Sequence, residues 1–250
     1  MTILDYIQKI IIDFELHSVQ GIRECFENGV NPNTIIHGKP LIYELINMYT
    51  RGPMFKDCIN IFVEYGLEMN DKILLAVLTD EANALDILLQ ADSEALNKKY
   101  TFACTFTPLY EASLLHICAE YNHVSCAKVL IKYGVDVNVK AGYDENGFGG
   151  QTPIFHTVNQ DANKCIDMMK YLINQKADLS ITVMGLVWGK GYDWETFIPA
   201  INPISYAMMG LLRQFQRKEE QIYEVVNVLL KTAYKIDYQP TNIPNKYLTT

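Results

Sequence analysis

The chain has 250 residues, 49% of them hydrophobic, so it can bury a sizeable core. Its 21 Lys and Arg against 29 Asp and Glu give a formal charge of −8, which argues against a general binder of the nucleic-acid backbone and favours a basic partner. Six scattered cysteines without a Cys-x-x-Cys pair predict reduced, buried thiols in a cytoplasmic protein rather than a disulfide framework.

The first predicted element is a helix over residues 3–15. Its apolar positions recur at helical spacing and form one face: Ile3, Leu4, Ile7, Ile10, Ile11 and Phe14. Charged residues such as Asp5 and Lys9 interrupt the apolar run, and no small-residue cleavage site follows it. We therefore expect neither a signal peptide nor a membrane span, and no membrane partner.

A ten-residue ending then recurs along the chain. Its clearest copy is VLIKYGVDVN at residues 129–138. Copies without gaps lie at 61–70 and 171–180, and weaker ones lie at 25–33 and 228–233. Where the copy keeps its glycine, as at Gly66 and Gly134, we expect a left-handed residue that ends the second helix of a repeat.

The beginnings of the repeats are similar to one another too. Lys39-Pro40, Ser113-Leu114, Thr152-Pro153 and Asn202-Pro203 each precede a short apolar helix. With these openings and endings the chain resembles the ankyrin-repeat family, over roughly residues 18–236. The best copy is 113–138, in which His116 and Gly134 have the family's separation and His123 lies at its mid-repeat position.

This resemblance implies an all-α fold, an ankyrin-repeat solenoid of about five or six helix pairs with extended β-hairpin fingers. A single domain would fill residues 1–250, with a capping helix at 1–17, repeats at 18–236 and a C-terminal tail at 237–250. Residues 71–97 keep two apolar helices without the family's proline, histidine or glycine. We expect them to form a degenerate repeat.

Long connections at 98–112, 139–151 and 181–201 lie where ankyrin proteins carry their fingers. The last one mixes β-branched and aromatic residues around Gly189-Lys190-Gly191, which predicts a β-hairpin with a glycine turn.

Templates for catalysis and metal binding find no match. The sequence has no histidine pair at i, i+4, no Cys/His cluster and no Gly-x-Ser-x-Gly, and the glycine-rich run 142–150 lacks the lysine of a phosphate loop. We expect His116 to bridge neighbouring repeats, and Cys118 and Cys126 to be small core residues. The prediction is a non-enzyme without metal or cofactor.

Aromatic and acidic residues in two fingers are the candidate partner-binding set: Tyr143, Asp144, Glu145, Phe148, Trp188, Tyr192, Asp193, Trp194 and Glu195. Large rings are enriched at protein interfaces, and carboxylates at finger tips would steer a basic partner. The rings could equally pack finger against finger, and the sequence leaves both interpretations open.

The resemblance implies a non-catalytic protein-protein interaction module that binds a protein partner through its concave face and fingers. One alternative is a microbial immunity protein that neutralises a cognate basic toxin, and others are a secreted host-directed effector and a cytosolic scaffold. Partner, organism and oligomeric state stay open.

Overall fold

The computed structural model describes residues 2–209, 217–235 and 237, and in this part the chain consists mostly of paired helices. The first helices of the successive pairs are α1 (Ile3–Glu15), α3 (Ile42–Ile46), α5 (Lys72–Leu78), α7 (Leu114–Tyr121), α9 (Phe155–Val158) and α11 (Pro203–Ala207). The second helices are α2 (Val19–Glu27), α4 (Phe55–Glu64), α6 (Ala82–Ala91), α8 (Val124–Lys132), α10 (Ile166–Asn174) and α12 (Glu219–Tyr234). Short 3-10 turns occur at η1 (Ser93–Asn97) and η2 (Asp161–Asn163).

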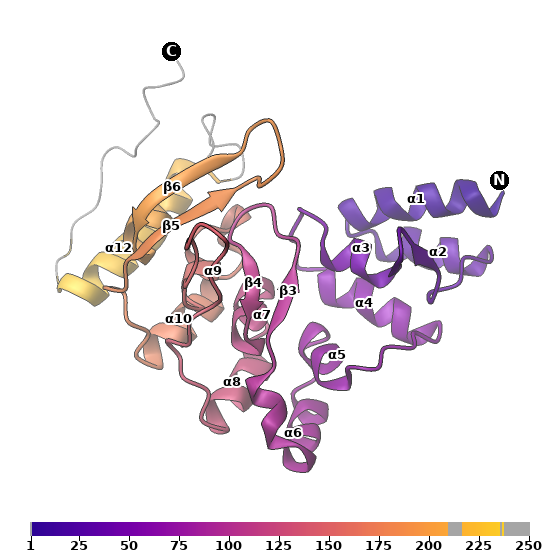
Figure 1. Ribbon diagram of the computed structural model, residues 1–250, viewed down its shortest axis with the longest axis horizontal. Coiled ribbons are helices and arrows are strands. Elements are labelled where there is room, and N and C mark those ends of the chain that lie inside the picture. Colours follow the sequence, from indigo (N-terminus) through magenta and orange to yellow (C-terminus); the bar gives the residue numbers. More distant parts are fainter. Residues whose placement is uncertain (1, 210–216, 236, 238–250) are drawn as a thin grey trace.

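The helix pairs stack side by side from α1 and α2 at one end to α11 and α12 at the other (Figure 1). First helices pack on first helices, as α7 does on α5 and α9, and second helices pack on second helices. The buried apolar residues form one core through the stack, with Ile22, Phe62, Leu85, Leu115 and Leu172 fully buried in successive pairs. Each pair thus buries its apolar face on its neighbours, as expected for a repeat fold.

Helix starts follow the predicted openings with small shifts. Asn202 caps α11 through its side-chain Oδ1, and Pro203 is the first residue of that helix. Pro40 and Pro153 instead lie just before their helices, in a strand and a turn respectively. The predicted helix over 3–15 is confirmed as α1, which begins with a capping box between Thr2 and Asp5.

Helix ends confirm the glycine prediction. Gly66 and Gly134 have φ angles of +89° and +88° directly after the last turn of α4 and α8. In the third copy of the ending, Lys176 stands where the others have glycine, and it adopts the same left-handed conformation with φ +70°. The turn geometry therefore persists where the glycine is lost, at a cost in backbone strain.

Antiparallel hairpins connect successive pairs. They are β1 (Ile35–Ile36) with β2 (Lys39–Pro40), β3 (Tyr100–Phe102) with β4 (Leu109–Ala112), and β5 (Val183–Trp188) with β6 (Thr196–Ile201). The β5–β6 hairpin is the longest and projects beyond the helices (Figure 1).

The limits of the domain stay a prediction. The division into a cap at 1–17, repeats at 18–236 and a tail at 237–250 has a described helix at its start, but 238–250 lie outside the described residues. The helix α11 ends at Ala207, and residues 210–216 also lie outside the described residues. No helix in the described ranges combines the length and the apolar composition that crossing a bilayer requires.

Candidate functional site

The connections between repeats join into one surface, which we call the finger platform. It consists of residues 100–112, 141–151 and 183–201. Backbone hydrogen bonds link the fingers: the Gly142 N–H donates to the Tyr110 carbonyl over 2.9 Å, and the Gly149 N–H donates to the Gly185 carbonyl over 3.2 Å. These bonds attach the middle finger to the β3–β4 and β5–β6 hairpins, which remain separate two-stranded sheets, so the fingers do not project independently.

Glycines make this close approach possible. A Cβ on Gly142 would lie 2.6 Å from the Glu111 Cβ of the β3–β4 finger, and a Cβ on Gly149 would lie 2.3 Å from the Gly142 carbonyl oxygen of its own finger. Both distances are well inside van der Waals contact. The glycine-rich run at 142–150 therefore lets the middle finger fold tightly and lie close against the β3–β4 finger.

Trp188 attaches the β5–β6 hairpin to the helices. It is only 3% exposed, and its Nε1–H donates to the Tyr206 hydroxyl of α11 over 2.8 Å. That hydroxyl shares a second hydrogen bond of 2.8 Å with the Thr107 hydroxyl of the β3–β4 finger. Phe106 packs edge-on against the indole, with ring centroids 5.6 Å apart. This tryptophan holds the platform in place and presents almost no surface.

The other finger aromatics lie on the outside. Tyr192 and Trp194 are 56% and 41% exposed, and their rings stack with centroids 5.5 Å apart. Tyr143 is exposed, and so is Phe197, which covers the half-buried Phe148 at a centroid distance of 4.5 Å. We call these rings the aromatic strip; two pairs within it are in contact, Tyr192 with Trp194 and Phe197 with Phe148.

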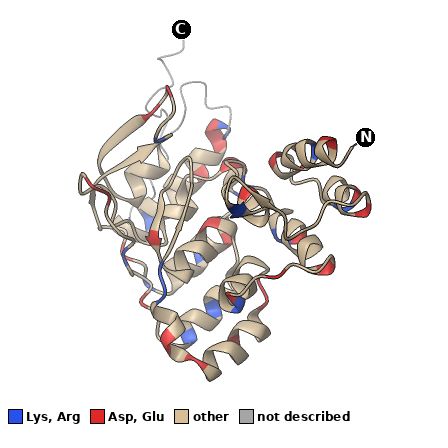
Figure 2. Ribbon diagram, turned by 45° about the vertical axis from the view of Figure 1, so that its right-hand side comes forward, with Lys and Arg blue, Asp and Glu red and all other residues tan. Residues whose placement is uncertain are grey.

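The acidic candidates fall into two kinds. Lys190 pairs with Glu145 over 2.9 Å and with Asp144 over 3.5 Å, so these two carboxylates are partly neutralised. Asp193 and Glu195 are exposed at the hairpin tip, where Figure 2 shows acidic and basic residues together. Burial would raise the pKa of Asp144, but backbone N–H donors and the Lys190 charge lower it.

A pocket of about 420 Å³ opens within the platform. The three fingers supply most of its walls, with Phe102, Leu109, Phe148 and Leu186 among the apolar side chains. Its volume is in the range of ligand-binding pockets. The pocket and the aromatic strip together make the platform the main candidate site.

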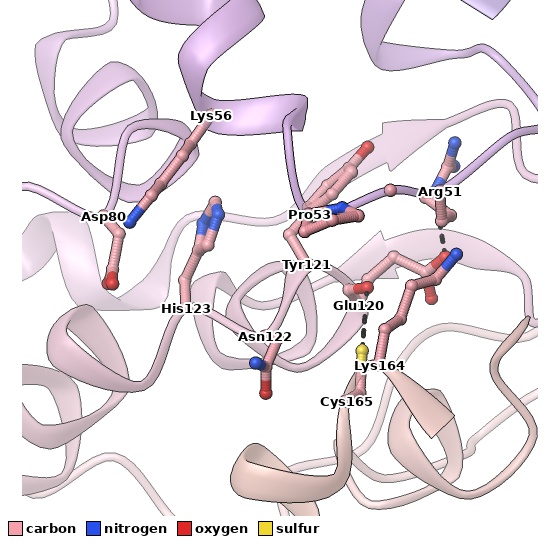
Figure 3. Close-up of a pocket in the computed structure, with 11 residues that line it drawn as sticks. Arg51, Pro53, Lys56, Asp80, Glu120, Tyr121, Asn122, His123, Lys164 and Cys165 are labelled. Atoms are coloured by element: carbon pink, nitrogen blue, oxygen red, sulfur yellow. Dashed lines mark hydrogen bonds and ion pairs between the residues drawn. The ribbon is translucent and has the colours of Figure 1, made fainter. Parts of the chain in front are cut away.

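A second polar site lies among the helices and is shown in Figure 3. The Arg51 Nε–H, from the loop between α3 and α4, donates to Glu120 Oε1 of α7 over 3.0 Å. Glu120 Oε2 accepts from His156 Nδ1–H of α9 over 2.9 Å and from Gln160 Nε2 over 3.2 Å. Burial raises the pKa of Glu120, but the His156 hydrogen bond and the Arg51 charge outweigh it and lower the pKa to about 2. We call these four residues the buried polar network.

Two cavities adjoin this network, one of about 130 Å³ and one of about 350 Å³ whose walls include Arg51, Glu120 and Gln160. The two lysines of the smaller cavity do not converge: Figure 3 shows Lys56 extending toward Asp80 and Lys164 extending toward Glu120. The Glu120 carboxylate is already occupied on both oxygens. The arrangement connects repeats and offers no assembled set of groups for a ligand or a reaction.

In the described ranges no three His, Cys, Asp or Glu side chains are placed to hold a metal ion. Cys118 and Cys126 are buried and unpaired, and burial raises the pKa of both thiols. His116 accepts from the Ser113 N–H and donates from Nε2 to the Gln151 carbonyl over 2.9 Å, which confirms the predicted bridge between repeats.

Sequence reasoning missed both the buried polar network and the pocket. The local signal was Glu120, the one carboxylate in the mostly apolar helix α7. Its partner Arg51 lies 69 residues away, so no spacing rule could pair them.

Comparison with known proteins supports the repeat assignment. Residues 73–183 match the family model described as ankyrin repeats, in 3 copies. The match runs from α5 to the first residue of β5, so it includes the degenerate repeat and two of the platform's fingers. No curated protein matches the chain.

Proposed function

Because the chain is an ankyrin-repeat protein, and ankyrin repeats are generally protein-interaction modules, we propose that it binds a protein partner through the finger platform. The observation that carries the proposal is the strip of exposed aromatic rings there. Exposed rings that gather on one surface, with polar residues around them, are typical of protein interfaces.

The two tryptophans divide the roles. Trp188 is buried and supports the hairpin, whereas Trp194 is exposed beside Tyr192. A partner that covers Trp194 and Tyr192 would desolvate two large rings that already hold each other in one orientation, so little side-chain entropy is lost on binding. We assign these two residues as anchors of the interface.

A basic partner suits the same surface. Asp193 and Glu195 are exposed beside the anchors, and the chain as a whole carries a formal charge of −8. Neutralisation of a cognate basic toxin is one form of this function, which the charge favours over a host-directed effector role. The unpaired cysteines are compatible with action in the cytoplasm.

Site-specific photocrosslinking tests the proposal. A photoreactive phenylalanine replaces Tyr192 in one variant and the exposed Ile87 of α6 in a matched control. Crosslinks from position 192 and none from 87 support the platform as the interface, and the reverse pattern contradicts it.

The captured partner then allows quantitative measurements. Trp194→Ala should weaken its binding by about 2 kcal/mol, as expected for an anchor, while Ile87→Ala should leave affinity unchanged. Reversing Asp193 and Glu195 to lysine should slow association and flatten its salt dependence. A folded Trp194→Ala variant with unaltered affinity contradicts the assignment of this anchor.

A further inference from the structure

The platform pocket has apolar walls and a charged mouth. Leu109 and Leu186 are fully buried behind it, Phe148 and Tyr192 form parts of its sides, and Lys190 lies at its edge. The pocket's volume of about 420 Å³ equals roughly a dozen or more water molecules at about 30 Å³ each. A long amino-acid side chain fits this space.

Two acceptors that line the pocket are left underused. Asp144 Oδ1 accepts the backbone N–H groups of Asn146 and Phe148 over 2.9 Å, while Oδ2 lies 3.5 Å from Lys190 Nζ. Charge-assisted hydrogen bonds are normally about 2.7–2.9 Å long, so this second contact is incomplete. Asp144 is 17% exposed on its side chain and held by the loop, so it cannot easily reorient.

The second acceptor is deeper. Gln151 is 1% exposed and lines the same pocket. Its Nε2–H donates to the Pro108 carbonyl, and its Oε1 has no hydrogen-bond partner among the residues that the structure describes. A buried amide oxygen without a donor is costly, and a ligand group that donates hydrogen bonds would remove that cost.

Lys190 shows which chemistry suits the mouth of the pocket. Its ammonium group binds Glu145 over 2.9 Å and Asp144 over 3.5 Å, yet its side chain stays 55% exposed. It is held on the turn between Gly189 and Gly191, which both have positive φ angles. The Lys190–Glu145 pair has a normal length but is exposed to solvent, and the Lys190–Asp144 contact is long, so another cation could take the place of Lys190 at Asp144.

We propose that the platform pocket receives a lysine or arginine side chain of the protein partner. Its charged head enters first, displaces Lys190 from Asp144 and donates to the buried Gln151 Oε1. Its aliphatic stem lies behind the head, against the sides of the pocket formed by Phe148 and Tyr192. The complementarity is chemical: the underused groups identified here are acceptors, and lysine and arginine carry donors only. This inference rests on the proposed function, because it names the part of the partner that the platform binds.

Short peptides test the inference without the partner itself. The probes are capped pentapeptides with a central lysine, arginine or norleucine between glycines, and binding is followed by NMR shifts of the Leu186 and Val187 methyl groups, which line the pocket. The cationic peptides should shift these methyls and bind about tenfold more tightly than the norleucine peptide.

Two variants make the test specific. Lys190→Met keeps the stem and removes the competing charge, so the cationic peptides should bind about threefold or more tightly, in proportion to how often Lys190 occupies the site. Asp144→Asn keeps the Oδ1 acceptor that holds the loop and removes the charge, so it should weaken the cationic peptides by about tenfold and leave the norleucine peptide unchanged.

The outcomes separate this inference from the proposed function. Equal binding of norleucine and lysine peptides, or no gain from Lys190→Met, overturns the cation pocket while the crosslinking result at position 192 still stands. Partner crosslinks only at position 87 contradict the platform as the interface, and with it the partner as the source of the side chain, even where the cationic peptides still bind the pocket.

Discussion

Substitution of Gly134 measures how much stability the left-handed residue at the end of a repeat costs when it is not glycine. It has a φ angle of +88°, and a Cβ added to it would meet nothing within 4 Å. Gly134→Ala therefore introduces backbone strain without a steric clash. The left-handed conformation costs an ordinary residue roughly 1–2 kcal/mol, and alanine recovers roughly 0.4–1 kcal/mol through its less flexible unfolded chain, so we expect a net loss of about 1 kcal/mol.

Lys176 provides the matched control, because it occupies the same position in the third copy with φ +70°. Lys176→Gly should relieve the strain and raise the free energy of unfolding by up to about 1 kcal/mol. Urea unfolding followed by circular dichroism gives both values, and each kcal/mol corresponds to a shift in Tm of about 2–4 °C. If both variants change stability in the same direction, or neither changes it, backbone strain does not determine the stability difference between glycine and other residues at these two turns.

Further predictions concern buried polar groups and the two tryptophans. Burial, with the nearby His156, lowers the pKa of His116 in the folded protein to about 3. As the pH drops below the ordinary histidine pKa, the unfolded chain binds a proton at this residue that the folded protein does not, so the free energy of unfolding falls. Lowering the pH from about 7.5 to 5.5 should therefore cost about 1.4 kcal/mol of stability through this histidine. Urea titrations at both pH values should show that a His116→Gln variant does not have this part of the loss. Glu120→Ala should lower the free energy of unfolding by about 3–5 kcal/mol, because it leaves a buried arginine without its counter-charge; a loss below about 1 kcal/mol by denaturant titration contradicts this. Trp188→Ala should cost about 3–5 kcal/mol of stability, while Trp194→Ala should cost about 1 kcal/mol or less, and thermal melts of the two variants compare them directly.

The repeat pattern was readable from the sequence because its signals are local. The glycine after α8, the Ser113 start of α7 and the apolar spacing between them each depend on a few neighbouring residues. The same holds for the hairpin over 181–201, whose glycine turn and β-branched flanks predict β5 and β6.

The site was less readable because it depends on which way each side chain faces. Trp188 and Trp194 look equivalent in the sequence, but Trp188 pairs in register with Thr196 and reaches Tyr206, while Trp194 lies in the turn. That difference comes from the hairpin register and from a helix outside the hairpin, neither of which composition encodes. The structure therefore shows which finger aromatics are buried and which are exposed. That the exposed ones bind a partner stays a prediction.

Because of the buried polar network, the stability of this solenoid is not a simple sum of contributions from neighbouring helix pairs. In a simple repeat array each unit touches only its neighbours, so free energies add along a one-dimensional chain and the ends can fray independently. Here Arg51 reaches past the α5–α6 pair to Glu120, and Phe55 of α4 stacks on Tyr121 of α7 with ring centroids 3.9 Å apart. These contacts between pairs that are not neighbours couple the N-terminal helix pairs to the central ones. If the degenerate repeat opens alone, the pairs on either side of it stay in contact with each other. We therefore expect the array to unfold in larger cooperative units than a single helix pair.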